Sequence, residues 1–101
     1  RVLFRSLEDA RERGENIRDE KVAILAALQS SIDENERLDQ DYRTALAYLT
    51  EAINTSTAED EQAIQRKLQL EVKLEELRAE YETLVEQTER LREQRELLAR
   101  M

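Results

Sequence analysis

The chain has 101 residues, a net charge of −8 and 40% charged residues, with one glycine and no proline, histidine or cysteine. Loops usually need Gly and Pro to turn the chain, so this composition argues against a loop-rich globular fold and favours long helices. Without histidine or cysteine, the common nucleophile systems and zinc sites cannot form. We therefore expect no enzymatic activity, no cofactor and no metal site.

The charges are spread evenly along the chain. Residues 1–53 and 54–101 each hold 8 basic and 12 acidic residues, so no basic patch is available for nucleic acid or for an anionic membrane surface. The longest apolar run, Val22–Leu28, is far shorter than the roughly 20 residues of a bilayer span. The absence of cysteine favours an intracellular, cytoplasmic or cytoskeletal location. Because the first residue is Arg1, we expect residues 1–101 to be a single coiled-coil segment of a larger protein.

The first half of the chain follows a heptad repeat. Its a and d positions run from Leu7 to Ala52 with alternating spacings of three and four. Most e positions are apolar too, with Phe4, Leu25, Ile32, Leu46 and Ile53. A face this wide predicts contact with more than one neighbouring helix.

The second half follows a stricter repeat. Five leucines recur every seven residues at d, from Leu70 to Leu98, and Leu74, Tyr81 and Thr88 occupy a positions between them. This pattern indicates a helix with a single leucine seam.

The two repeats differ in phase by four residues, and the change falls within residues 53–62. Asn54 could end one helix, and Ser56 or Thr57 could cap the next with an acidic residue three positions on. We expect an all-α fold with helices at about 3–53 and 58–101 and a turn at about 54–57. The alternative is a continuous helix with a stutter, which would suit a parallel two-stranded coiled coil.

The seam positions favour antiparallel contact between the two helices. Pairing Leu28 with Leu84 and Leu38 with Leu74 gives the same sum of residue numbers, 112, which places the reversal at Ser56. The same pairs would form within a hairpin or across a domain-swapped antiparallel dimer. Asn35 at an a position is predicted to specify the register or the number of helices.

The predicted helix–helix interface combines the a, d and e positions of both repeats. It comprises Ile17, Ile24, Leu28, Ile32, Asn35, Leu38, Tyr42, Leu46, Leu49, Ile53, Leu70, Leu74, Leu77, Tyr81, Leu84, Leu91 and Leu98.

The pattern resembles the rods of cytoskeletal, centriolar and vesicle-tethering scaffolds as a class. It predicts a structural oligomerisation or spacer segment that acts by helix–helix self-association. We expect a homo-oligomer, with a dimer as the simplest case, and other coiled-coil proteins as further partners. The alternative is an adaptor whose exposed apolar stripe binds the helix of a partner or a regulatory protein.

Overall fold

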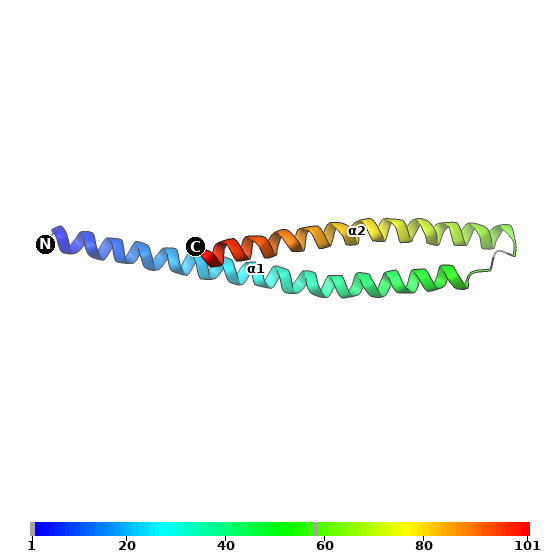
Figure 1. The fold of residues 1–101 in the computed structure, drawn as a ribbon, viewed down its shortest axis with the longest axis horizontal. Helices are drawn as coiled ribbons and strands as arrows, with labels where there is room; N and C mark the ends of the chain where they lie inside the picture. The colour runs from blue at the N-terminus through cyan, green and yellow to red at the C-terminus, as the bar shows by residue number, and fades with distance from the viewer. Residues whose placement is uncertain (1, 58) are drawn as a thin grey trace.

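The chain folds as an all-α, antiparallel helical hairpin (Figure 1). The computed structural model describes residues 2–57 and 59–101. Helix α1 spans Val2–Thr55 and α2 spans Glu61–Arg100. Ala58, the expected start of the second helix, lies outside the described residues. The prediction of an antiparallel hairpin is confirmed, and the chain does not form the continuous helix with a stutter.

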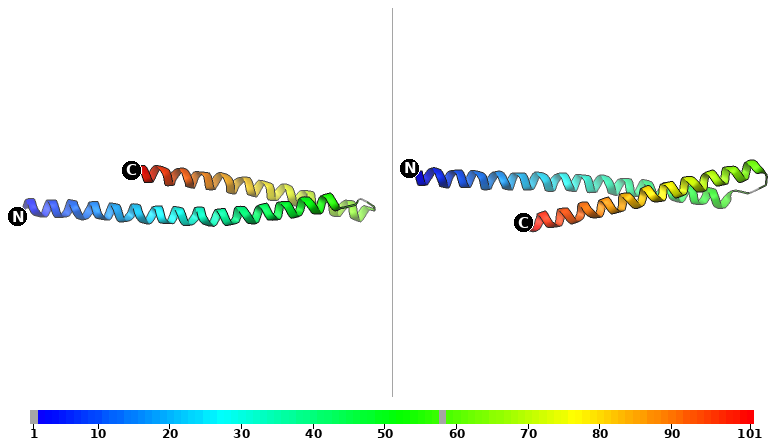
Figure 2. Two further views of the ribbon diagram at one scale, coloured as in Figure 1. Left: turned by 60° about the horizontal axis from the view of Figure 1, so that its bottom comes forward. Right: turned by 90° about the horizontal axis from the view of Figure 1, so that it is seen from above.

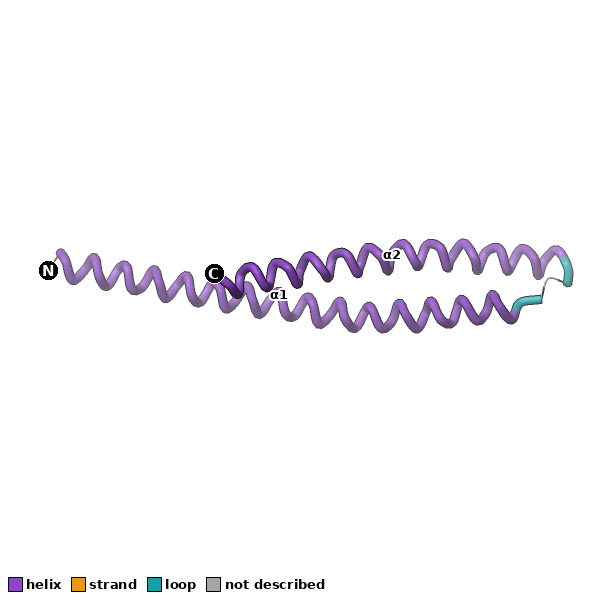
Figure 3. Tube along the Cα trace, viewed as in Figure 1, coloured by secondary structure: helices purple, strands orange, loops and turns teal. Residues whose placement is uncertain are grey.

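The hairpin is a thin rod measuring 90 × 18 × 15 Å. The two helices cross as they run alongside each other (Figure 2), and they make up nearly the whole described chain (Figure 3). No helix within the described ranges is both long enough and apolar enough to cross a bilayer.

The two helices are long because little in the sequence interrupts them. Both are rich in Glu, Arg, Leu, Ala and Gln, the residues with the highest helix propensity. Gly14 is the only glycine, and it lies within α1 in ordinary helical conformation. Neither helix contains proline, so every backbone N–H can take part in the helical ladder.

The turn lies a few residues later than predicted. Asn54 and Thr55 remain helical, and no described residue has a positive φ, so Asn54 does not end α1 in a left-handed conformation. The hydroxyl of Ser56 donates to the carbonyl of Ala52 at 2.7 Å and completes the last turn of α1 instead of capping α2.

The N-cap of α2 is Asp60. Its backbone is extended, with φ −143°, and its carboxylate accepts the backbone N–H of Ala63 at 2.7 Å. Aspartate is at least as favourable as serine at this position, and its charge also complements the helix dipole. The prediction that Ser56 or Thr57 caps the second helix is therefore wrong.

The register of the hairpin also differs from the predicted one. The rings of Tyr42 and Tyr81 lie 6.0 Å apart, and Asn35 bonds Thr88 across the helices, so facing residue numbers add to 123 and not to 112. Leu28 and Leu84 are therefore displaced by about 11 residues, or roughly 16 Å along the axis. The prediction placed the reversal at Ser56, but α2 begins beyond the end of α1 (Figure 1).

The N-terminal part of α1 projects beyond the C-terminal end of α2 (Figures 1 and 2). We refer to residues 5–21 as the arm. From Arg5 to Glu20 every residue but Gly14 is exposed. Within the described chain the arm is a single helix with no helix packed against it.

Candidate helix–helix interface

The seam between the helices is the main apolar contact among the described residues. On α2 it is formed by the predicted a and d positions, with Leu74 and Leu84 buried and Leu70, Leu77, Tyr81, Leu91 and Leu98 half-buried. On α1 it is formed by Leu25, Leu28, Ile32, Asn35, Tyr42, Leu46, Leu49 and Ile53. Ile32 is the deepest of these side chains, with 1% of its surface exposed.

The predicted d positions of α1 do not lie in this seam. Ile17, Ile24 and Leu38 are 66%, 51% and 40% exposed within the hairpin, and the predicted pairing of Leu38 with Leu74 is not formed in the observed register. Their place in a helix–helix interface stays a prediction about contacts with a further helix. The helix turns its a and e rows toward α2 instead. Alongside α2 the e row holds four large apolar residues, whereas the d row includes Ser31, Ala45 and Ala52. Burying the larger side chains removes more apolar surface from water.

This choice leaves an apolar row on one edge of the hairpin. We call Ile17, Ile24, Ser31, Leu38 and Ala45 the outer stripe; its members are spaced by seven residues and none is fully buried. The sequence contains this row, but only the structure shows that α2 does not cover it.

A polar layer interrupts the seam near its middle. The Asn35 amide donates to the Thr88 hydroxyl at 3.1 Å, and that hydroxyl donates to the Leu84 carbonyl at 2.7 Å. Thr88 is only 6% exposed. Because no buried side-chain polar atom of the described residues lacks a partner, the layer avoids the cost of an unsatisfied buried group. The sequence placed Thr88 at an a position, but its pairing with Asn35 follows only from the observed register.

Two tyrosines pack next to this layer. The rings of Tyr42 and Tyr81 are tilted by 39°, and the Tyr42 hydroxyl donates to the Glu80 carboxylate at 3.3 Å. Burial raises the pKa of Tyr42 above its ordinary value, and the negative charge of Glu80 adds to the effect. The rings fill the seam while their hydroxyls reach its edges, as amphipathic aromatic side chains do.

One edge of the seam is closed by polar contacts between the helices, and we call it the polar edge. Arg95 donates to Gln29 at 2.8 Å, Arg92 pairs with Glu36 at 3.3 Å, and Arg43 donates to the Tyr81 hydroxyl at 3.1 Å. The outer stripe lies on the opposite edge, because its residues fall on the other side of the seam rows around α1.

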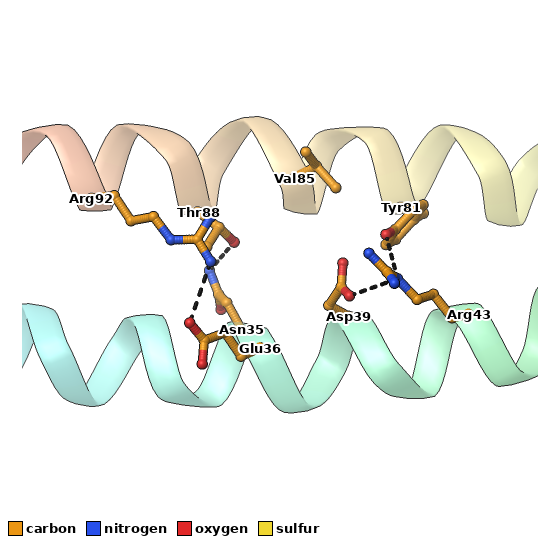
Figure 4. A pocket seen from close by; sticks show the side chains of 8 residues that line it. All are labelled: Asn35, Glu36, Asp39, Arg43, Tyr81, Val85, Thr88 and Arg92. Carbon is orange, nitrogen blue, oxygen red and sulfur yellow. Dashed lines mark hydrogen bonds and ion pairs between the residues drawn. The ribbon is translucent and has the colours of Figure 1, made fainter.

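A shallow cavity of about 230 Å³ opens on the polar edge (Figure 4). Asn35 and Thr88 lie at one end, and Arg43 and Tyr81 at the other. Arg43 contacts Asp39 at 2.9 Å and Arg92 contacts Glu36, so the two positive and two negative charges cancel. This arrangement suits alignment of the two helices better than capture of a charged ligand.

Comparison of the chain with protein-family models, with curated proteins and with solved structures found no match.

The seam assignment predicts different costs for two apolar residues on α1. Ile32→Ala should lower the free energy of unfolding by about 2–4 kcal/mol, as truncation of a buried side chain does. Leu38→Ala should lower it by less than about 1 kcal/mol because Leu38 is already 40% exposed in the hairpin. Chemical denaturation measures both values. Equal losses at the two positions would contradict the seam described here.

The polar layer makes a second prediction. Asn35→Leu should raise the unfolding free energy by about 1 kcal/mol, because an apolar side chain replaces a polar one in the seam. The register should become less uniform, which would appear as extra backbone amide peaks in NMR spectra. Asn16→Leu, on the exposed arm, is the matched control and should change neither property. A single sharp set of peaks for Asn35→Leu would show that the layer does not specify the register.

Proposed function

We propose that this chain is a structural coiled-coil segment that builds or spaces an assembly by self-association of its helices. The main support for this proposal is the outer stripe. Three large apolar side chains of this heptad row, Ile17, Ile24 and Leu38, remain exposed on a rod 90 Å long after α2 has covered the a and e rows. Heptad spacing is the pattern by which helices pack against further helices.

The physical reason for association is the surface that the hairpin leaves in water. Ile24 and Leu38 are both substantially exposed within the length covered by α2. Covering such side chains with a second copy removes apolar surface from water at about 25 cal/mol per Å². Binding also costs translational and rotational freedom, so the association depends on the whole stripe and not on a single residue.

The finer part of the proposal concerns the setting. We propose that the parent protein is an intracellular scaffold of the cytoskeletal type, in which the segment serves as an oligomerisation element or spacer. The support is the rod shape and the composition, which contains no cysteine for disulfide stabilisation in an oxidising compartment.

A second candidate function is that of an adaptor for the helix of another protein. It is favoured by a separate apolar patch near the turn, made by Ile64, Leu68 and Val72, all exposed on α2. A shallow groove of about 470 Å³ adjoins the patch and is lined by Leu68, Val72 and Ile53 among others. An amphipathic helix could place apolar anchors in this groove.

Light scattering coupled to size exclusion tests the proposed function. The mass should exceed 11.9 kDa, the mass of one chain, and the unfolding temperature should rise with protein concentration. Ile24→Ser should lower the mass toward that of one chain. Val22→Ser is the matched control, because Val22 is exposed but lies outside the outer stripe. A mass of 11.9 kDa at every concentration would contradict self-association and favour the adaptor.

A further inference from the structure

We propose that two copies of the chain associate antiparallel, with the arm of each copy lying along the outer stripe of the other. This inference rests on the proposed self-association and adds the orientation and the groups that recognise each other. It follows from the charges on two parts of α1 that lie far apart within one chain.

The arm is a helix whose apolar side is basic. Leu7, Ala10, Gly14 and Ile17 share one side of it, since they are spaced by three and four residues. At 100° per residue, the half of the helix centred on this side carries Arg11, Arg13, Arg18 and Lys21, with Glu20 just beyond its edge. The opposite half carries one base, Arg5, and the acids Glu8, Asp9, Glu12, Glu15, Asp19 and Glu20.

Arg13 is one of the basic residues available to bind another chain. Its guanidinium donates to the backbone carbonyl of Asp9 at 3.3 Å and pairs with no carboxylate in the described chain. Arg11, by comparison, already lies 3.7 Å from Glu15 on its own helix.

The outer stripe within the hairpin has acidic neighbours. Glu34 and Asp41 each lie three residues after a stripe position on α1, and Glu80 of α2 flanks the other side beside Tyr42. Among the described residues, Glu34 and Asp41 have neither an ion-pair nor a hydrogen-bond partner. The two rows directly beside the stripe contain no Lys or Arg between Ile24 and Tyr48, and Arg37 lies one row further out. The rows that a second helix would contact are therefore acidic and attract a basic helix.

The basic side of the arm and the acidic flank of the stripe meet when two α1 helices cross antiparallel about a two-fold axis at Ile24. Ile24 then packs on the partner's Ile24, and Ala10 packs on the partner's Leu38. In this register Arg13 reaches the partner's Glu34, and the two-fold axis repeats every contact. Each arm becomes a third helix beside the partner hairpin.

A parallel pairing lacks this complementarity. In register, it would place arm beside arm and stripe beside stripe, so Arg13 and the partner's Glu34 would lie roughly 30 Å apart along the axis and could not pair. It would also face Gly14 with a second Gly14 and leave a gap in the layer. The parallel arrangement therefore leaves Arg13 and Glu34 without each other, whereas the antiparallel arrangement opposes their unlike charges.

A charge exchange tests this pairing by light scattering across a dilution series of the full chain. Arg13→Glu and Glu34→Arg should each raise the dimer dissociation constant by on the order of tenfold, because each puts like charges together at two symmetric sites. The double variant R13E/E34R should restore it to within about twofold of the unchanged chain. Arg5→Glu makes the same charge change on the other side of the arm and should have little effect.

Cysteine pairs test the orientation in the same protein. Ala10→Cys and Leu38→Cys variants should remain uncrosslinked alone and form a mixed disulfide dimer when combined. Disulfides within each separate variant would identify a parallel dimer and overturn the inference. Dimerisation that Arg13→Glu and Arg5→Glu weaken to the same extent would also overturn the inference. In that case the proposed self-association itself would still stand. A chain that stays at 11.9 kDa at all concentrations would overturn both proposals.

Discussion

The structure depends on one constraint: α1 buries its a and e rows against the a and d rows of α2. Ile32, Leu74 and Leu84 are the buried apolar side chains of this seam, and the Asn35–Thr88 hydrogen bond aligns it. A shift of one heptad would place Asn35 opposite Tyr81 or Arg95, and it would lose its buried hydroxyl partner. Apolar burial therefore supplies the stability of the hairpin, while the polar layer selects one register among several that bury similar area.

The same constraint makes the two edges of the rod different. On the polar edge, Arg92 and Arg95 of α2 pair with residues of α1, and these exposed contacts are worth little individually. On the other edge, Glu34 and Asp41 beside the outer stripe have no ion-pair partner on α2 among the described residues. Polar groups on the polar edge are already paired, whereas the outer stripe leaves apolar side chains exposed. A further helix can therefore pack on the edge that holds the outer stripe. This asymmetry links the fold to the proposed function.

The fold class could be predicted from the sequence because the strongest signals are local. Five leucines at intervals of seven define the seam face of α2 without reference to α1, and the near absence of glycine and proline requires long helices. The choice of face on α1 could not be predicted in this way. Its d and e rows are both apolar, and only packing against α2 favours the larger e-row side chains such as Ile32 and Leu46.

The register and the turn were predicted less well for a related reason. Ser56, Thr57 and Asp60 are all good N-cap residues, so local propensity does not distinguish between them. Choosing Ser56 as the reversal point displaced every predicted pair by about 11 residues, roughly three helical turns. Asn35 was recognised as a residue that specifies pairing, but its partner, Thr88, could be identified only once the register was known.

Intrachain disulfide formation tests the register most directly. Leu46 and Leu77 face each other in the observed register, so cysteines at both positions should lie within the roughly 7 Å between α-carbons that a disulfide requires. Under mild oxidation of dilute protein, the variant L46C/L77C should close a bond within one chain. The variant L28C/L84C should not, because its cysteines are separated by roughly 16 Å along the axis. Rapid closure of the 28–84 bond, or failure of the 46–77 bond in a folded chain, would contradict the seam on which this account rests.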